Sequence, residues 1–451
     1  MKSVLILGAG ISGLGAAHVL LRHDVKVLIS DLKDSIHDKK EKEALTALGA
    51  VFRFGPQSVD LLDGVDTVVV SPVIPRENPI VSEAFNRHID VISEVELAYR
   101  VTKAPILAIT GTNGKTTTTT LLGSMVSRSG KPFALAGNLG ISLSREAELV
   151  PADGVIAAEV SSFQLEFIKT FKPRAAVILN ITPDHLERHH TMEAYVAAKA
   201  RIFENMDNSD CLLLNDDDDD AYTPALKKKA ETHTHVCLLS TSHKVEEGAF
   251  LDGDTLVLRR KGKEIRLCSV KELKLKGMQN YEDVLAASFL AYEGGVPVDV
   301  IVSAMKDFSS LPNRIEYVRT LRDVEYYNDS KATNTDAAIK GMSAFNKPVI
   351  LIAGGYDKGT PLEDFMKDVK KHTKHLILLG AAADRFEKAA RAAGVSSIYR
   401  VSSMKEAVLK GQQLAEAGDI VILSPACSSF DMYHNMEERG MDFKRIVKSL
   451  T

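Results

Sequence analysis

The chain has 451 residues, a length at which about three domains of ordinary size are expected. Hydrophobic residues make up 45% and charged residues 26%, and the formal net charge is −4, so we expect globular domains and neither nucleic acid nor a membrane as a partner. The four cysteines lie far apart without a C-x-x-C pair, which argues against a disulfide framework and a cysteine zinc site and favours the cytoplasm.

The first block opens on a glycine-rich loop. Short β-rich runs alternate here with helical patterns, as in a parallel sheet, at residues 3–8, 25–30 and 66–72. The loop carries G-x-G-x-x-G at Gly8, Gly10 and Gly13, and Asp31 follows about 20 residues later, a pattern typical of diphosphate binding at a helix N-terminus. The pattern allows NAD or another diphosphate ligand. Its glycines also favour strand, turn and helix over a signal peptide.

A second, different glycine loop opens the next block. The apolar run 106–110 leads directly into "GTNGKTT" at residues 111–117. Glycines between a strand and a helix direct backbone N–H groups at an anion, so Lys115 is expected to reach terminal phosphates and Thr116 to bind Mg²⁺. The spacing is shorter than G-x-x-x-x-G-K-[ST], and the alternative is an ordinary helix N-terminus.

Three polar residues follow in otherwise apolar surroundings. Glu159 ends an apolar run, where a carboxylate is costly unless it meets a cation or reaches the surface. His185 follows the next run. Lys199 shares a helix face with Tyr195 and Phe203, so its ammonium either extends to water along the aliphatic stem or points into a site, where it could be chemically modified.

The third block again combines apolar runs with polar motifs. The runs are residues 348–355, 375–380 and 419–429. "LPNR" and "NDSKATN" supply cations and carboxylates that could stabilise charge on a transferring phosphoryl group. The second motif could equally be a polar turn with Asn334 or Thr335 as a helix N-cap. Asn280 in "GMQN" has the same alternative, with Asp283 three residues later.

These motifs resemble the Mur ligase family, the ATP-dependent amino-acid ligases of peptidoglycan precursor synthesis. The resemblance spans nearly the whole chain and rests on "GTNGKTT", "EVSSFQLE", "NITPDHLERH", "AAKARIFEN", "GMQN", "LPNR" and "NDSKATN". "GTNGKTT" alone would also fit folylpolyglutamate synthase. "NDSKATN" together with "LSPACSSFDMYHNMEERG" is most similar to the branch that joins D-glutamate to UDP-N-acetylmuramoyl-L-alanine.

The resemblance implies an α/β fold of three domains. It places a Rossmann-like UDP-substrate domain at residues 1–97, a central P-loop ATPase-like domain at 98–308, and a Rossmann-like amino-acid-binding domain at 309–451. It also implies a cytoplasmic monomer that uses ATP and two Mg²⁺ ions. The alanine carboxylate would attack the γ-phosphate of ATP, and the D-glutamate amine would then displace phosphate from the acyl phosphate.

The resemblance also implies roles for individual residues. Its ATP-binding positions are Gly111, Thr112, Asn113, Gly114, Lys115, Thr116, Thr117, Asn280, Arg314, Asp329 and Lys331. Its UDP-substrate positions are Ile11, Ser12, Asp31, Lys33, Ser71, Asn138, Ser161 and His185. Its D-glutamate positions are Thr333, Lys358, Ser429 and Phe430. The resemblance implies that Thr116 and Glu159 bind one Mg²⁺, and that Glu159, His185 and a carbamylated Lys199 bind the other. The catalytic residues that it implies are Lys115, His185 and Lys199.

Two rival functions use fewer of these features. An NAD-dependent oxidoreductase would use the first glycine loop but leave "GTNGKTT" and "NDSKATN" without a role. A non-catalytic nucleotide sensor would need the second loop but not Lys199, Lys358 and Ser429 together. Phosphate release that requires both the acceptor and the amino acid would separate a ligase from both rivals.

Overall fold

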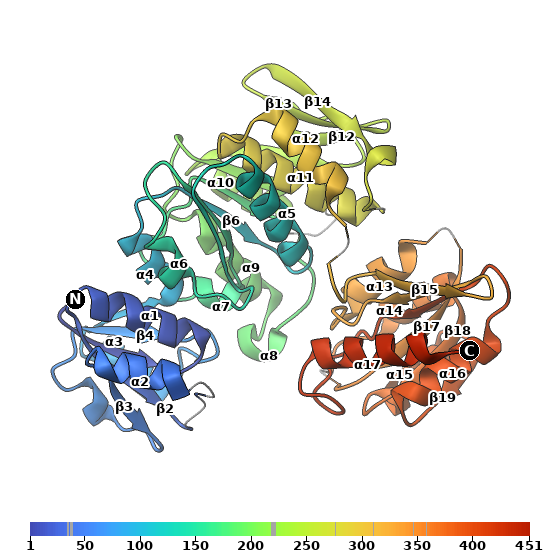
Figure 1. Ribbon diagram of the computed structural model, residues 1–451, viewed down its shortest axis with the longest axis horizontal. Coiled ribbons are helices and arrows are strands. Elements are labelled where there is room, and N and C mark those ends of the chain that lie inside the picture. Colours follow the sequence, from blue (N-terminus) through green and yellow to red (C-terminus); the bar gives the residue numbers. More distant parts are fainter. Residues whose placement is uncertain are drawn as a thin grey trace. The chain divides into compact units, whose positions relative to one another are not determined.

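The computed structural model describes residues 1–33, 36, 39–217, 222–275, 277–309, 311–345, 347–357 and 359–451. Lys358, predicted to bind D-glutamate, therefore lies outside the described residues. The chain forms two compact units (Figure 1). The first comprises residues 1–273 and 281–307, and the second comprises residues 274–280 and 308–451.

The first unit begins with a parallel five-stranded sheet in the order β3-β2-β1-β4-β5. Its strands are β1 (Ser3–Leu7), β2 (Lys26–Asp31), β3 (Val51–Phe54), β4 (Thr67–Val70) and β5 (Asp90–Ser93). The accompanying helices are α1 (Ile11–Arg22), α2 (Lys39–Ala47), η1 (Val59–Leu62), α3 (Pro79–Asn86) and α4 (Glu94–Val101). The central strand β1 is buried on both faces, which explains its continuous apolar run. The runs of β3 and β5 were not singled out in the sequence.

A nine-stranded sheet completes the first unit, in the order β14-β13-β12-β11-β10-β9-β6-β8-β7. Its strands are β6 (Ile106–Thr110), β7 (Phe133–Gly137), β8 (Val155–Glu159), β9 (Ala175–Ile178), β10 (Cys211–Asn215), β11 (His235–Ser240), β12 (Gly248–Asp252), β13 (Thr255–Arg260) and β14 (Lys263–Ser269). The helices after β6 are α5 (Lys115–Arg128), α6 (Leu143–Ala147), α7 (Ser162–Leu165), α8 (Leu186–His189), α9 (Met192–Ala200), η2 (Arg201–Phe203), α10 (Thr223–Ala230), η3 (Val270–Glu272), α11 (Met278–Glu293) and α12 (Val298–Asp307).

One edge of this sheet departs from the parallel arrangement that the sequence predicts. The strands β12, β13 and β14 pair antiparallel, in two successive hairpins. The second hairpin turns at Lys261 and Gly262, which have φ values of 49° and 73°. Two consecutive positive φ angles define the type I′ turn that suits a two-residue hairpin. This local turn signal, rather than helix alternation, sets the direction of these strands.

The second unit is built on a six-stranded sheet in the order β15-β16-β20-β17-β18-β19. Its strands are β15 (Glu316–Leu321), β16 (Val324–Asn328), β17 (Val349–Gly354), β18 (Thr373–Leu379), β19 (Ile398–Arg400) and β20 (Ile420–Leu423). Its helices are α13 (Thr335–Ser343), α14 (Glu363–His372), α15 (Ala383–Ala392), α16 (Met404–Leu414) and α17 (Met436–Ser449). Only β15 runs antiparallel to its neighbour; the other strands of this sheet are parallel.

The three sheets fall within the three blocks inferred from the sequence. The boundaries of domains at residues 97 and 308 stay a prediction. Among the residues that the structure describes, every helix is too short or too polar to cross a membrane.

Candidate active site

The loop between β6 and α5 has the conformation that its glycines permit. Gly111 and Gly114 have φ values of 150° and 86°, and Gly114 is the N-cap of α5, which begins at Lys115. A Cβ atom on Gly114 would lie 2.2 Å from Oδ1 of Asp283, so a larger residue does not fit. The first N–H groups of a helix have no partner within it, and the helix dipole favours an anion there. The loop thus has the geometry of a phosphate site.

Asn180, which follows β9, holds this loop in place. Its Oδ1 accepts a hydrogen bond from the Asn113 backbone N–H at 2.8 Å, and its Nδ2 donates to the Asn113 carbonyl at 3.2 Å. Its own carbonyl accepts from the Thr112 N–H at 2.9 Å. The sequence placed Asn180 at a strand end without giving it a role. These bonds leave the loop little freedom to rearrange when an anion binds.

Two lysines meet at one carbonyl of the loop. Nζ of Lys199 donates to the Gly111 carbonyl at 2.7 Å, and Nζ of Lys115 donates to the Gly111 and Thr112 carbonyls at 2.9 and 2.8 Å. Lys199 is 2% exposed, so the alternative in which it extends to water is wrong. Burial and the neighbouring charge of Lys115 lower the pKa of Lys199 well below 10.5, and the charges of Asp184 and Glu159 oppose this shift.

Glu159, the last residue of β8, lies on the strand that pairs with β6, which leads into the loop. It pairs with Ile109, the next-to-last residue of β6. It is 2% exposed, and its Oε1 accepts a hydrogen bond from Nδ2 of Asn138 at 2.8 Å. Its Oε2 is buried and has no hydrogen-bond partner among the described residues. Such an oxygen is expected where a cation is bound, because an unpartnered buried carboxylate oxygen is costly.

The first glycine loop is held by a carboxylate instead. Oδ2 of Asp31 accepts from the Ala9 N–H at 2.8 Å, and Oδ1 accepts from the Lys33 N–H at 3.2 Å. Ser71 donates from Oγ to the Gly8 carbonyl at 3.4 Å. Asp31, Lys33 and Ser71, predicted to contact the UDP-substrate, therefore surround one loop, at the N-terminus of the helix that begins with Ile11 and Ser12.

The glycines of this first loop differ in what surrounds them. A Cβ atom on Gly13 would lie 2.0 Å from the Gly8 carbonyl oxygen, so close packing requires glycine there. A Cβ atom on Gly10 would meet no described atom within 4 Å. The outer side of the loop is therefore open to a ligand, whereas its inner side is closed by the helix.

In the second unit, Asp329 follows β16 and is 4% exposed. Its Oδ2 accepts from Oγ of Ser424 at 2.8 Å, and its Oδ1 accepts from the Ile315 N–H at 3.2 Å. Burial raises the pKa of Asp329 to about 7, against the effects of the Ser424 hydrogen bond and the Arg314 charge. Nε of Arg314 is buried and has no hydrogen-bond partner in the described part of the chain. Arg314 and Asp329 thus lie near each other, and their roles in nucleotide binding stay predictions.

Arg439 of α17 links the two motifs of the second unit, and the sequence did not reveal it. It is 3% exposed, and it donates from Nε to Oγ of Ser330 at 2.9 Å and from Nη2 to the Ser330 carbonyl at 2.8 Å. Nη1 donates to the carbonyls of Cys427 and Ser428 at 3.0 and 3.2 Å. Burial lowers the pKa of Arg439 to about 10. "NDSKATN" and "SPACSS" are therefore held together by one buried cation.

Comparison with known proteins agrees with these motifs across the whole chain. Residues 2–93 match the family described as Mur ligase MurD-like, N-terminal domain; residues 109–291 match Mur ligase middle domain; and residues 313–427 match Mur ligase, glutamate ligase domain. A UDP-N-acetylmuramoylalanine–D-glutamate ligase from Thermoanaerobacter pseudethanolicus is 43% identical over 100% of this chain and 98% of its own length. The protein of the same name from Lachnoclostridium phytofermentans is 40% identical over the same shares. The chain belongs to the Mur ligase family.

Solved structures of Mur-type ligases have the same fold. A pseudomurein peptide ligase type C from Methanothermus fervidus gives a TM-score of 0.60 at 19% identity, with both chains covered fully. MurF ligase from Thermotoga maritima, determined in complex with ADP, gives 0.60 at 14% identity over 94% of this chain and 95% of that one. The expectation of a three-sheet α/β Mur ligase is confirmed.

Other predicted positions of this Mur ligase differ in their surroundings. His185 has a φ of 55°, and its half-exposed ring lies 3.7 Å from Asp184 and 3.5 Å from Glu187; its roles in metal and substrate binding stay predictions. Ser161 caps α7 in a capping box with Gln164.

Of the two helix N-caps that the motifs of this Mur ligase suggested, Asn334 is one and Asn280 is not. Oδ1 of Asn334 accepts from the Ala337 N–H at 2.8 Å, so the capping of α13 is confirmed. Asn280 as an N-cap is wrong, because α11 begins at Met278 and Asn280 lies within its first turn. Among the D-glutamate positions, Ser429 is buried whereas Phe430 is 70% exposed.

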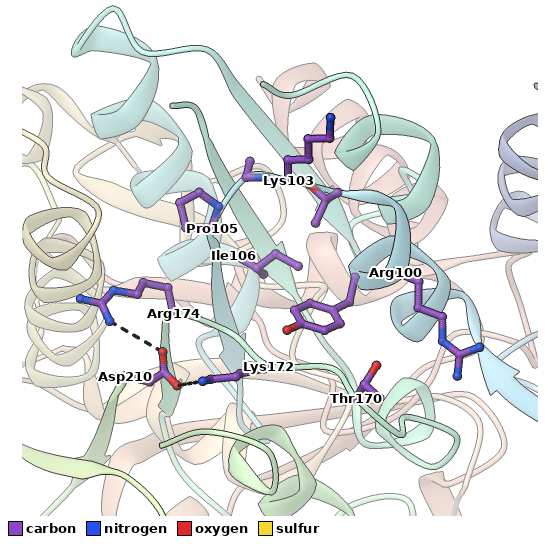
Figure 2. Close-up of a pocket in the computed structure, with 11 residues that line it drawn as sticks. Arg100, Lys103, Pro105, Ile106, Thr170, Lys172, Arg174 and Asp210 are labelled. Carbon is purple, nitrogen blue, oxygen red and sulfur yellow. Dashed lines mark hydrogen bonds and ion pairs between the residues drawn. The ribbon is translucent and has the colours of Figure 1, made fainter. Parts of the chain in front are cut away.

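A pocket of about 630 Å³ opens at the opposite end of the nine-stranded sheet (Figure 2). It lies at the amino ends of β6, β9 and β10, whereas the phosphate loop follows the carboxyl end of β6. Figure 2 shows Asp210 between two of its cations: Nζ of Lys172 lies 3.2 Å and Nη1 of Arg174 lies 3.7 Å from the carboxylate. In this Mur ligase, Lys172 and Arg174 are therefore each paired with a carboxylate that lines the same pocket.

Proposed function

We propose that this Mur ligase joins D-glutamate to UDP-N-acetylmuramoyl-L-alanine with consumption of ATP. The observation that carries the proposal is the convergence of Lys115 and Lys199 on the Gly111 carbonyl, in the same loop as a helix N-terminus. An NAD-dependent oxidoreductase has no use for such a loop. The names of the full-length relatives support the choice of substrates.

Lys115 is proposed to bind the terminal phosphates of ATP. Its Nζ lies against loop carbonyls at 2.8 and 2.9 Å, so it can turn toward an anion held by the loop amides. An ammonium aimed at the transferring phosphoryl group stabilises the charge that develops there. Asn280, Arg314, Asp329 and Lys331 are proposed to bind the rest of the nucleotide.

The residues around Glu159 fit Mg²⁺. A hard cation takes oxygen ligands, and the buried Oε2 of Glu159 is a carboxylate oxygen without another described partner. Thr116, in the first turn of α5, is the proposed hydroxyl ligand. When bound, the ion would neutralise phosphate charge and orient the γ-phosphoryl group.

Lys199 is proposed to react with carbon dioxide to form a carbamate. The neutral amine adds to CO₂ and loses a proton, which converts a cation into an anionic oxygen ligand. Complete burial beside another ammonium group favours the neutral amine that this reaction needs. Together with Glu159 and His185, the carbamate is proposed to hold a second Mg²⁺.

The first glycine loop is proposed to bind the UDP part of the acceptor. Its open side at Gly10, the helix N-terminus at Ile11 and Ser12, and the carboxylate of Asp31 suit a nucleoside diphosphate. Lys33 and Ser71 are proposed contacts at the same loop. Asn138 and Ser161 are proposed to contact the muramoyl part, and Asn138 already bonds Glu159.

The D-glutamate site is proposed to lie in the second unit, at Thr333, Lys358, Ser429 and Phe430. In the proposed reaction, an oxygen of the alanine carboxylate attacks the γ-phosphorus, and the bond to ADP breaks. The D-glutamate amine then attacks the acyl carbon, loses a proton, and displaces inorganic phosphate. Positioning and charge neutralisation supply most of the rate increase in such transfers.

A product assay tests this proposal. The enzyme would be incubated with ATP, Mg²⁺, UDP-N-acetylmuramoyl-L-alanine and a panel of L- and D-amino acids. We expect ADP, phosphate and one new amide with D-glutamate, and little product with L-glutamate. Preferential ligation of another amino acid would favour another Mur-type or folylpolyglutamate-type ligase. The monomeric state and cytoplasmic location stay predictions.

A further inference from the structure

The nine-stranded sheet contains a second group of polar side chains, far in sequence from the phosphate loop. His235 and Cys237 lie on β11, Glu247 immediately precedes β12, and Cys211 is the first residue of β10. Their metal-binding atoms meet: one atom each from His235, Cys237 and Glu247 all lie within 4.8 Å of one another. The cysteines looked unrelated in the sequence, because only strand pairing brings them together.

The distances in this group are close to those of a tetrahedral metal site. Nε2 of His235 lies 2.6 Å from Oε2 of Glu247, and Sγ of Cys237 lies 3.9 Å from the same oxygen. Sγ of Cys211 lies 3.2 Å from Sγ of Cys237. Bond lengths of about 2.0–2.3 Å to zinc put neighbouring ligand atoms roughly 3.3–3.8 Å apart in a tetrahedron. Shifts of less than about 1 Å in the separations of His235 and Cys237 from Glu247 would therefore admit the ion, whereas Cys211 lies outside the set of atoms within 4.8 Å of one another.

Strand geometry places these side chains on one face. Cys211 pairs with His235 in the parallel register of β10 and β11, and Cys237 follows His235 by two residues. Residues two apart in a strand point to the same side of the sheet. Both thiols are buried, whereas the side chains of His235 and Glu247 are 41% and 28% exposed, which gives an ion a route from solvent.

Hydrogen bonds from two neighbouring residues orient the Glu247 carboxylate. Arg260 donates to Oε2 of Glu247 at 2.7 Å and to Glu293 at 2.8 Å, so one guanidinium is shared by two carboxylates. The Lys261 N–H donates to Oε1 of Glu247 at 2.9 Å, which fixes the orientation of this carboxylate. Hydrogen bonds of this kind, from outside the ligand set, are typical of metal-binding carboxylates.

We propose that His235, Cys237 and Glu247 bind one Zn²⁺ or a similar borderline-soft divalent cation, with water as the fourth ligand. Thiolate and imidazole ligands select zinc over Mg²⁺, so this site would not compete for the ion used with ATP. Binding releases the proton of the Cys237 thiol and cross-links β11 to the start of β12. The site is independent of the proposed ligase chemistry.

Cobalt substitution tests the site in the full-length protein without a histidine tag, kept reduced with a phosphine. Co²⁺ is expected to bind at one equivalent and give a thiolate-to-cobalt charge-transfer band with the visible bands of a tetrahedral ion, and Zn²⁺ should remove both. Excess Mg²⁺ should leave both unchanged. Competition with a chromophoric chelator would give the zinc affinity.

Matched variants locate the ligands. Cys237→Ser and His235→Gln should each weaken zinc binding by about 100-fold or more, because loss of a supporting partner alone costs about 10–100-fold. Cys268→Ser, which changes a buried cysteine on β14, should retain affinity and spectrum. Circular dichroism would check that each variant is folded, and the half-exposed His235 still gives a test if Cys237→Ser is not. The absence of stoichiometric cobalt binding, or an unchanged spectrum in a folded Cys237→Ser or His235→Gln variant, would overturn the proposal.

Discussion

The two glycine loops of the first unit both precede a helix, yet one is held by an acidic side chain and the other is contacted by two lysines. The loop after β1 is held by the carboxylate of Asp31, which accepts from the Ala9 N–H. The loop after β6 has two lysine side chains, Lys115 and Lys199, that both donate to the Gly111 carbonyl. A carboxylate that fixes the loop suits binding of a diphosphate that does not react and is held by backbone N–H groups. Two lysines suit a loop at which a phosphoryl group is transferred.

Of the substitutions at the two loops, Lys199→Ala should lower turnover the most. Loss of the proposed carbamate removes a metal ligand worth several kcal/mol, so we expect turnover to fall by about 10³ or more. Formate or acetate should partly restore it by supplying a carboxylate. The exposed Lys103 offers a control, and Lys103→Ala should change turnover by less than about twofold. Near-normal turnover of Lys199→Ala would show that the second loop does not depend on this residue.

Lys115→Ala should have the next largest effect. Removal of one preorganised charge from the transition state typically costs roughly 3–4 kcal/mol, or about 10²–10³ in kcat. Affinity for the UDP-substrate should change little, because that ligand is assigned to the first loop. Steady-state kinetics with each substrate varied in turn would measure both quantities. Turnover within about threefold of the parent enzyme would contradict the assignment of residues 111–117 as the phosphate loop.

Asp31→Ala should affect binding rather than chemistry. A charged hydrogen bond contributes about 1.5–3 kcal/mol, so we expect KM for the UDP-substrate to rise about 10–100-fold with kcat nearly unchanged. Asp66 is a matched control, since it accepts from the Lys2 N–H at 2.7 Å at the other end of β1. A similar rise in KM for Asp66→Ala would mean that the effect arises from loss of domain stability.

Asp31 also has a buried counterpart in the second unit. Asp329 accepts a backbone N–H too, but burial raises its pKa from 3.8 to about 7, so the folded protein holds a proton that the unfolded chain releases in this interval. Folding stability from this group therefore falls as pH rises from about 4 to 7. Asp329→Asn should have a higher melting temperature than the parent near pH 8, by at least about 2 °C, and less advantage near pH 5.

Asp357 is the control for this pH dependence, because its pKa is shifted in the opposite direction. The hydrogen bond from Arg385 lowers the pKa of Asp357, so this carboxylate stabilises the fold above its ordinary titration range. Asp357→Asn should therefore lower the melting temperature near pH 8. Equal shifts at both pH values for Asp329→Asn would contradict the proposed burial effect. Despite greater stability, Asp329→Asn should bind ATP more weakly.

The sequence predicted best what depends on neighbours in the chain. Apolar runs located the central strands, and the i, i+4 spacing of Tyr195 and Lys199 placed the lysine on a buried face. The sequence did not predict the roles of Asn180 and Arg439. Their hydrogen-bond partners lie in other elements, so no local sequence pattern distinguishes them from other polar residues. The antiparallel edge differs from the predicted parallel sheet because short turns such as that at Lys261 and Gly262, and not helices, connect its strands.

The wrong prediction of Asn280 as an N-cap also arose from reliance on a local pattern. An Asn followed by an acidic residue three positions later satisfies the local rule for a helix start, but the helix begins two residues earlier, at Met278. Cys211 and Cys237 show the reverse case, in which no local pattern exists and a parallel register alone creates proximity. Sequence patterns therefore located the two loops and Asp31, Lys115 and Lys199 beside them, but not the role of Asn180, which holds the second loop.

Transfer of a heavy oxygen isotope tests the central claim most directly, namely that the second loop phosphorylates a substrate held by the first. UDP-N-acetylmuramoyl-L-alanine labelled in both carboxylate oxygens would be turned over with unlabelled ATP and D-glutamate, and the released phosphate analysed by mass spectrometry. The account predicts one labelled oxygen in each phosphate ion, because the carboxylate oxygen that attacks the γ-phosphorus leaves with it. Unlabelled phosphate formed together with the amide product would contradict it.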